Sequence, residues 1–111
     1  MTVGPETELP RWRVELHLDG LATMEQELAM VSHTGVSVTT DVSAKLTVIV
    51  YMADAMLPSV PVISAVAVAQ HHVPHLQINA VQVTRSLSQR EAAAWVKKQF
   101  SNLNVSWKRD I

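Results

Sequence analysis

The histidines are the residues of this chain whose spacing best suits chemistry. Three of the five stand together in the segment His71-His72-Val73-Pro74-His75. His71 and His75 are four residues apart, a spacing that brings two imidazoles to one helix face for a transition metal. Pro74 interrupts that helix, and no carboxylate nearby in sequence completes or orients the set. The pattern favours solvated histidines at a helix end, and we predict no bound metal or cofactor.

Catalytic patterns are sparse in the rest of the chain. His17 and His33 are candidates for a general base, but neither comes with a nucleophile motif such as GxSxG. The absence of Cys excludes a cysteine nucleophile, a thiolate zinc site and a disulfide. The three Gly form neither GxGxxG nor GxxxxGK[ST], so there is no glycine-rich phosphate loop. We therefore expect a protein that is not an enzyme.

Charge and hydropathy further restrict the class of protein to which the chain can belong. Nine Lys and Arg against ten Asp and Glu leave a net charge of −1, so no long-range attraction to nucleic acid or anionic membranes is expected. Residues 55–84 contain no Asp, Glu, Lys or Arg, but the dense apolar part, 60–69, is too short to cross a bilayer. The N-terminus has no basic or apolar signal region, and we expect a cytoplasmic protein.

The first half of the chain predicts strand, helix, strand, strand. Residues 11–19 alternate strictly between apolar and polar side chains, which is typical of a strand with one wet face. A helix follows, opened by a Thr23–Gln26 capping box and closed near Gly35. Its apolar residues have the spacing of one helical stripe, the kind that usually faces a core: Leu21, Met24, Leu28 and Val31. Residues 36–40 and 45–52 then form a hairpin rich in β-branched residues.

The second half is predicted to be helix, strand, helix. Residues 59–72 fit a helix or a strand, and Ser59 as N-cap with Pro61 in the first turn favours the helix. Residues 75–85 read as a strand whose alternation slips at Val81, which suggests a bulge. Ser88 with Glu91 forms a second capping box, opening a helix that runs to about Phe100.

Short connections and right-handed crossovers close this order into one antiparallel sheet with both helices on one face. The predicted fold class is α+β: a ferredoxin-like βαββαβ sheet plus an appended C-terminal helix. We expect a flexible lead-in at residues 1–10 and a single domain at 11–111, because 111 residues make about one domain.

The segment Trp12-Arg13-Val14-Glu15-Leu16-His17-Leu18-Asp19-Gly20, followed by an amphipathic helix and a valine-rich hairpin, carries a resemblance. It is similar to small ferredoxin-like proteins of actinobacteria and their phages. The resemblance implies the ferredoxin-like fold and a cytosolic location, and it supplies no activity. In a phage-borne protein, a role in contact with the host would follow.

The predicted open face of the sheet offers a protein interface. An apolar patch of Ile49, Tyr51, Val81 and Val83 would be rimmed by arginines, and Tyr with Arg suits the centre of an interface. Three of the five aromatic residues lie in the C-terminal segment, which must pack either on its own core or on a second subunit. The residues expected to take part are Arg11, Arg13, Lys45, Ile49, Tyr51, Arg85, Trp95, Phe100 and Trp107.

These observations predict a small, non-enzymatic protein-interaction or regulatory module whose first expected partner is a second copy of itself. One alternative is a nucleic-acid-binding module that uses Arg11, Arg13, Lys45 and Tyr51 on the sheet face. An RNA-binding sheet needs two or three aromatic residues there, however, and only Tyr51 qualifies. The other alternative is an ACT-like sensor that binds a small molecule at a subunit interface.

Overall fold

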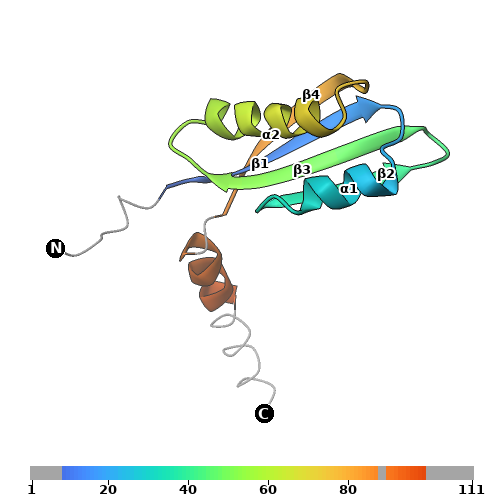
Figure 1. The fold of residues 1–111 in the computed structure, drawn as a ribbon. Coiled ribbons are helices and arrows are strands. Elements are labelled where there is room, and N and C mark those ends of the chain that lie inside the picture. Colours follow the sequence, from blue (N-terminus) through green and yellow to red (C-terminus); the bar gives the residue numbers. More distant parts are fainter. Residues whose placement is uncertain (1–8, 88–89, 100–111) are drawn as a thin grey trace, which may run out of the picture. The chain divides into compact units, whose positions relative to one another are not determined.

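The computed structural model describes residues 9–87 and 90–99 (Figure 1). The chain divides into two units, one of which is the sheet domain Leu9–Ser86 and the other of which contains a helix at residues 90–99. The prediction that residues 11–111 form one domain therefore stays a prediction. Phe100, Trp107 and most of the predicted lead-in lie outside the described residues.

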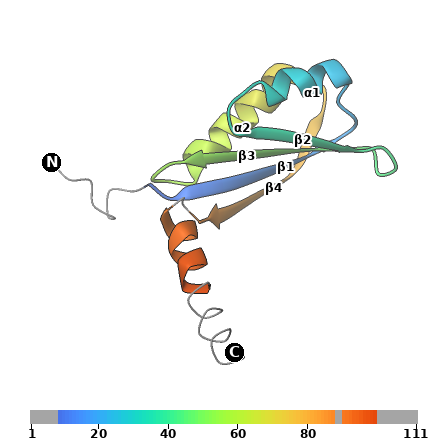
Figure 2. The same cartoon turned by 90° about the horizontal axis from the view of Figure 1, so that it is seen from below.

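The sheet domain has the predicted element order. Its elements are β1 (Arg11–Asp19), α1 (Met24–Val31), β2 (Val36–Asp41), β3 (Leu46–Asp54), α2 (Ser59–His72) and β4 (Gln77–Ser86). All strand pairs are antiparallel, and the strand order is β2-β3-β1-β4. Each helix therefore joins two strands that are separated by a third. Both helices lie on the same side of the sheet (Figure 2), so the predicted antiparallel α+β layer arrangement is confirmed.

The core lies between the sheet and the two helices. The even residues of β1, Val14, Leu16 and Leu18, are fully buried there, as their alternation predicted. Met30 of α1 and the small residues Ala65 and Ala69 of α2 cover them. Strand β1 thus presents one face to the core and its charged face to the opposite side of the sheet.

A buried hydroxyl fixes the connection between β1 and α1. The Ala22 N–H donates to Oγ1 of Thr47 at 2.9 Å, and the Thr47 hydroxyl donates to the Gly20 carbonyl at 2.8 Å. Thr47 is fully buried, so these two bonds satisfy a polar group that would otherwise carry a desolvation cost. They hold the connection in place at the end where α1 begins.

Helix α1 does not turn its predicted apolar stripe toward the core, although such a stripe usually faces the core. The Thr23–Gln26 capping box is present as predicted. The helix, however, turns Met30 to the sheet and exposes the predicted stripe, with Met24 74% and Leu28 64% exposed. The helix has only eight residues, and Ala22 in the preceding loop together with Met30 fills the available core contact. The stripe exists, but it faces solvent.

The prediction that Ile49 and Tyr51 of β3 lie on the open face of the sheet is wrong. Leu16 lies opposite Ile49 and Leu18 opposite Thr47, and directly opposed residues point to the same side of a sheet. Ile49 is therefore fully buried on the helix side, with Tyr51 half-buried on that same side. The prediction failed because both faces of β3 are apolar, so composition does not distinguish them. Pairing with β1 does.

The prediction for helix α2 and strand β4, which form the second crossover, was nearly correct. Residues 59–72 form a helix, with Pro58 rather than Ser59 as N-cap. In β4 the register with β1 shifts between His17 and Leu18, which leaves Asn79 as the additional residue of a bulge. The predicted bulge is thus present, two residues before the position at which the alternation slips. From Ala80 to Ser86 the pairing with β1 is regular.

Candidate interaction surface

Helix α2 is apolar on both of its sides. Its inward residues Pro61, Ala65 and Ala69 are buried against the sheet. On the outward side, Ile63 is 68% exposed and Val60 is more than half exposed. No charged residue stands anywhere between Ala55 and Gln70. Helices that are hydrophobic all round are normally buried, whereas this one forms the outer layer of its domain.

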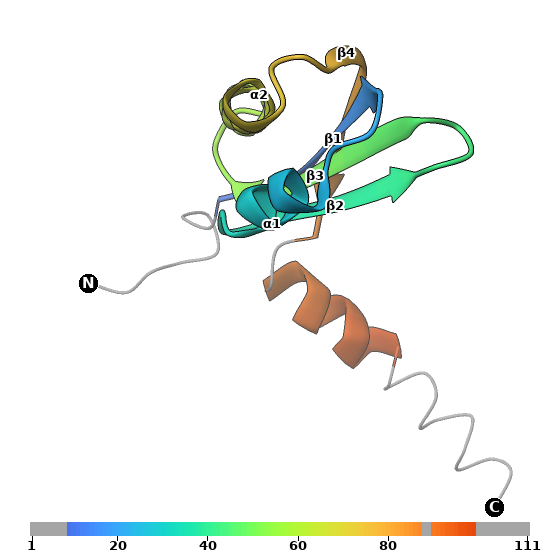
Figure 3. The same ribbon diagram turned by 45° about the vertical axis from the view of Figure 1, so that its right-hand side comes forward.

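Figure 3 views α2 almost along its axis, with one side toward the sheet and the other directed away from every strand of the domain. Met56 and Leu57, in the loop that leads into the helix, are also well exposed. Water-exposed Met, Leu, Val and Ile side chains gathered around one helix mark an interaction site more often than a free surface.

Residues 77–84 of strand β4 continue this uncharged character at the edge of the sheet, and Arg85 follows them near the end of the strand. It pairs only with β1 among the described strands, and nearly all of its residues are exposed. Val81 lies opposite Leu16, and Val83 lies opposite Val14, so both valines are on the helix side. They are nevertheless 45% and 40% exposed, because α2 packs on β1 and β3 and leaves β4 uncovered.

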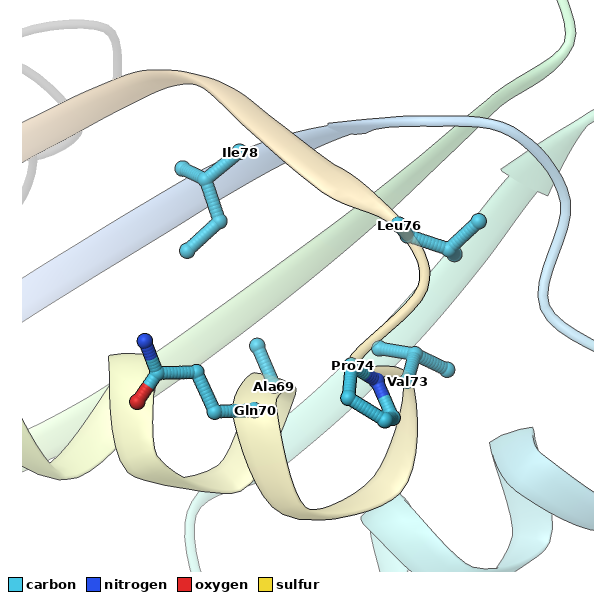
Figure 4. A pocket seen from close by; sticks show the side chains of 6 residues that line it. All are labelled: Ala69, Gln70, Val73, Pro74, Leu76 and Ile78. Carbon is cyan, nitrogen blue, oxygen red and sulfur yellow. The ribbon is translucent and has the colours of Figure 1, made fainter.

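Between α2 and β4 the structure has a shallow pocket of about 170 Å³ (Figure 4). It is lined by Ala69, Gln70, Val73, Pro74, Leu76 and Ile78. Sites for drug-sized ligands usually enclose about 300–1,000 Å³ and combine apolar walls with a few convergent polar groups. This pocket is smaller and has one polar side chain, Gln70. We give the name uncharged surface to the exposed large apolar residues of α2, of the loop that leads into it and of β4: Met56, Leu57, Val60, Ile63, Val81 and Val83.

The opposite face of the sheet is held together by ion pairs. On β1, Glu15 accepts hydrogen bonds from Arg13 and His17, which flank it on the same face. These bonds, that of Arg13 first, hold the pKa of Glu15 below its ordinary value. Arg11 is paired with Asp54 of β3 at 2.8 Å. Both arginines of the predicted nucleic-acid surface are therefore engaged with carboxylates of their own domain.

A histidine cluster joins the C-terminal ends of α1 and α2. Nε2 of His33 lies 2.8 Å from Nε2 of His72, and the His71 ring packs edge-on against His72. Partial burial, then the charges of His71 and His33, lower the pKa of His72. His33 and His72 are 39 residues apart in sequence, so the four-residue spacing of His71 and His75 did not indicate this contact. Among the described residues no group of three or more His, Asp or Glu has an arrangement that suits a metal ion.

The residues of the predicted interface do not share one surface. Arg11 and Arg13 are on the open face, whereas Tyr51 is on the helix side and Ile49 is buried. Lys45 lies in the β2–β3 turn with a positive φ of 54°.

Other predicted contributors lie elsewhere. Arg85 is opposite Trp12, on the helix side of β4. Trp95, in the helix at 90–99, is 57% exposed. Their roles in an interface stay predictions. Sequence reasoning missed Val60 and Ile63, although the lack of charge in residues 55–84 was visible.

Comparison with known protein families, with curated proteins and with solved structures finds no match. None of the helices in the described ranges, 9–87 and 90–99, is long and apolar enough to span a membrane. Function therefore has to be inferred from the surfaces of the chain itself.

Proposed function

We propose that this protein is a non-enzymatic interaction module of the ferredoxin-like class, extended by a C-terminal helix and active in the cytoplasm. Support for the class comes from the βαββαβ order and from the two helix crossovers, each of which spans an intervening strand.

The observation that carries the proposal is the outward side of α2. Covering a fully exposed Ile, Leu or Met side chain yields about 1.5–3 kcal/mol, and the free domain forgoes that gain at four positions around this helix: Met56, Leu57, Val60 and Ile63. The four side chains are between 53% and 72% exposed, so covering them would yield part of that full value at each. None of the four contributes to the buried core of the domain. A protein partner that covers them recovers this free energy, and so explains why a surface helix carries no charge.

The partner we propose first is a second copy of the chain. A surface without charge does not favour a partner of opposite charge. Two copies of it can meet without repulsion, because no like charges face each other. The two-fold dimer is also the commonest arrangement among soluble oligomers.

The two alternatives from the sequence receive less support. Nucleic-acid binding on the open face would have to displace Glu15 from Arg13 and Asp54 from Arg11, and Tyr51 is on the other side of the sheet. A small-molecule sensor would need a larger pocket than the one beside α2.

Light scattering over a concentration series tests the proposal with two matched variants. Ile63→Lys adds one positive charge to the uncharged surface, and Thr39→Lys adds the same charge to exposed β2. We expect the wild type and Thr39→Lys to associate equally and Ile63→Lys to associate less, with all three proteins folded; the melting temperature of Ile63→Lys should fall only by the stabilisation that association gives the wild type. Association of Ile63→Lys equal to that of the wild type, or a wild type that is monomeric at every concentration, would overturn the proposal.

A further inference from the structure

We infer that β4 pairs antiparallel with β4 of a second copy, about a two-fold axis at Gln82, and so joins the two sheets into one. This inference rests on the proposed function for its partner, a second copy. It assigns a contact to the β4 edge with Val81 and Val83, separate from the contact through the outward side of α2 that Ile63→Lys tests. It follows from three observations: the unprotected edge of β4, its self-complementary sequence and the exposure of its two valines.

Edge strands usually carry features that prevent pairing with another chain, such as Lys, Pro, short length or bulges. The other edge of this sheet, β2, has six residues and ends in Asp41, with Lys45 in the turn that follows. Strand β4 has ten residues and contains neither Lys nor Pro, and its one charged residue, Arg85, stands next to its last residue. Its bulge lies at Asn79, near the beginning, so the stretch from Ala80 onward is a regular strand. Within the sheet domain, Leu9–Ser86, no strand pairs with the outer edge of β4, so that edge is available to a partner strand.

Symmetry restricts the register. A two-fold axis perpendicular to the sheet keeps the helices of both copies on one side, and this requires one residue of β4 to face its own copy. With Gln82 on the axis, Val81 lies opposite Val83 of the other copy, and Ala80 lies opposite Thr84. With Val81 on the axis, Val83 would face Asn79; with Val83 on the axis, Val81 would face Arg85. Only the Gln82 register pairs both valines with valines.

That register also accounts for the exposure of the valines. In the free domain Val81 and Val83 are 45% and 40% exposed on the helix side. In the pair, four valines from two copies lie together across the axis, and β-branched cross-strand pairs of this kind stabilise adjacent strands. The two α2 helices lie on the same side of the joined sheet as these valines. On the opposite side, the two Gln82 side chains meet at the axis.

The absence of Cys allows a direct test, because a single introduced cysteine is the only thiol in the chain. Directly opposed residues of an antiparallel pair have Cα atoms about 4.5–5.5 Å apart, within the usual range for a disulfide. Gln82→Cys should therefore form a disulfide-linked dimer under mild oxidation. Ala80→Cys and Thr84→Cys should each stay monomeric on a non-reducing gel, because their own copies are about 13 Å apart. An equimolar mixture of these two variants should cross-link.

Thr39→Cys on β2 serves as the control for random collision, and the melting temperature of each variant confirms that it is folded. The inference is overturned if Gln82→Cys does not cross-link while light scattering still shows a dimer; the proposed function then stands with a different interface. A monomeric wild type overturns both. Cross-linking of Ala80→Cys with itself, or of Thr84→Cys with itself, would show another register.

Discussion

Leu16 of β1 and Ile49 of β3 lie directly opposite each other in the centre of the sheet, and both are fully buried beneath the helices. This pair determines which side of β3 faces the core. It places Thr47 inside the domain, and it turns Val48, Val50 and Met52 to the open face. The free energy of unfolding should therefore respond strongly to the odd residues of β3.

Thr47→Val removes a hydroxyl and leaves the shape of the side chain nearly unchanged. The Ala22 N–H and the Gly20 carbonyl both lose their partner. We expect the free energy of unfolding to fall by about 1–3 kcal/mol, the usual cost of a buried polar group left unsatisfied. Urea denaturation measures it. The exposed neighbour Thr40 is the control, and a loss for Thr40→Val as large as for Thr47→Val would contradict the assignment.

Substitution by alanine should destabilise the protein much more at one residue of α1 than at another. Met30 is fully buried and Leu28 is 64% exposed. Met30→Ala should cost about 2–5 kcal/mol, since it leaves a cavity in the core. Leu28→Ala should change stability by no more than about 0.5 kcal/mol. Thermal unfolding of the two variants compares them, and the reverse ranking would show that the sequence-predicted stripe faces the core after all.

Gly35 is a position at which a side chain does not fit. Its φ is +82°, and an added Cβ would lie against the carbonyl oxygen of Met52. Gly20 also has a positive φ, of +114°, so alanine strains the backbone at both positions, but the obstacle at Gly20 is the far end of the flexible Leu76 side chain and not a backbone atom. Gly35→Ala should therefore destabilise by more than about 1 kcal/mol and by more than Gly20→Ala. Equal losses in urea denaturation would argue that the backbone of β3 yields as easily as Leu76.

The lowered pKa of Glu15 predicts that the stability of the protein depends on pH. Its pKa is lowered in the folded state, chiefly by the hydrogen bond from Arg13, so the folded protein binds the proton less readily than the unfolded chain. The stabilisation is complete above the ordinary Glu pKa and is lost as the pH falls through the lower folded pKa. In a series of melting temperatures between about pH 6 and pH 3, Glu15→Gln should show a shallower decline than the wild type. Parallel curves would contradict this.

How much the sequence predicts depends on whether polar and apolar residues alternate. In β1 they do, and the buried row Val14, Leu16 and Leu18 follows directly. In β3 both rows are apolar, and only the partner strand decides between them. The stripe of α1 has the right spacing, but a short helix contacts the sheet through other residues.

The candidate surface was partly visible in the sequence. The lack of charge from residue 55 to residue 84 is plain there, but it first suggests a membrane segment. That these residues divide into an outer helix and an edge strand depends on tertiary structure. The contact of His33 with His72 likewise joins two helix ends that are far apart in sequence.

Hydrogen exchange at the backbone amides of β4 tests the central claim most directly. At protein concentrations above the dissociation constant, alternate amides between Ala80 and Ser86 should exchange more slowly than at low concentration, because the outward N–H groups then pair with the second copy. The amides of β2, at the other edge, should not change. Exchange rates in β4 that are independent of concentration, in a sample that light scattering shows to be dimeric, would contradict edge pairing.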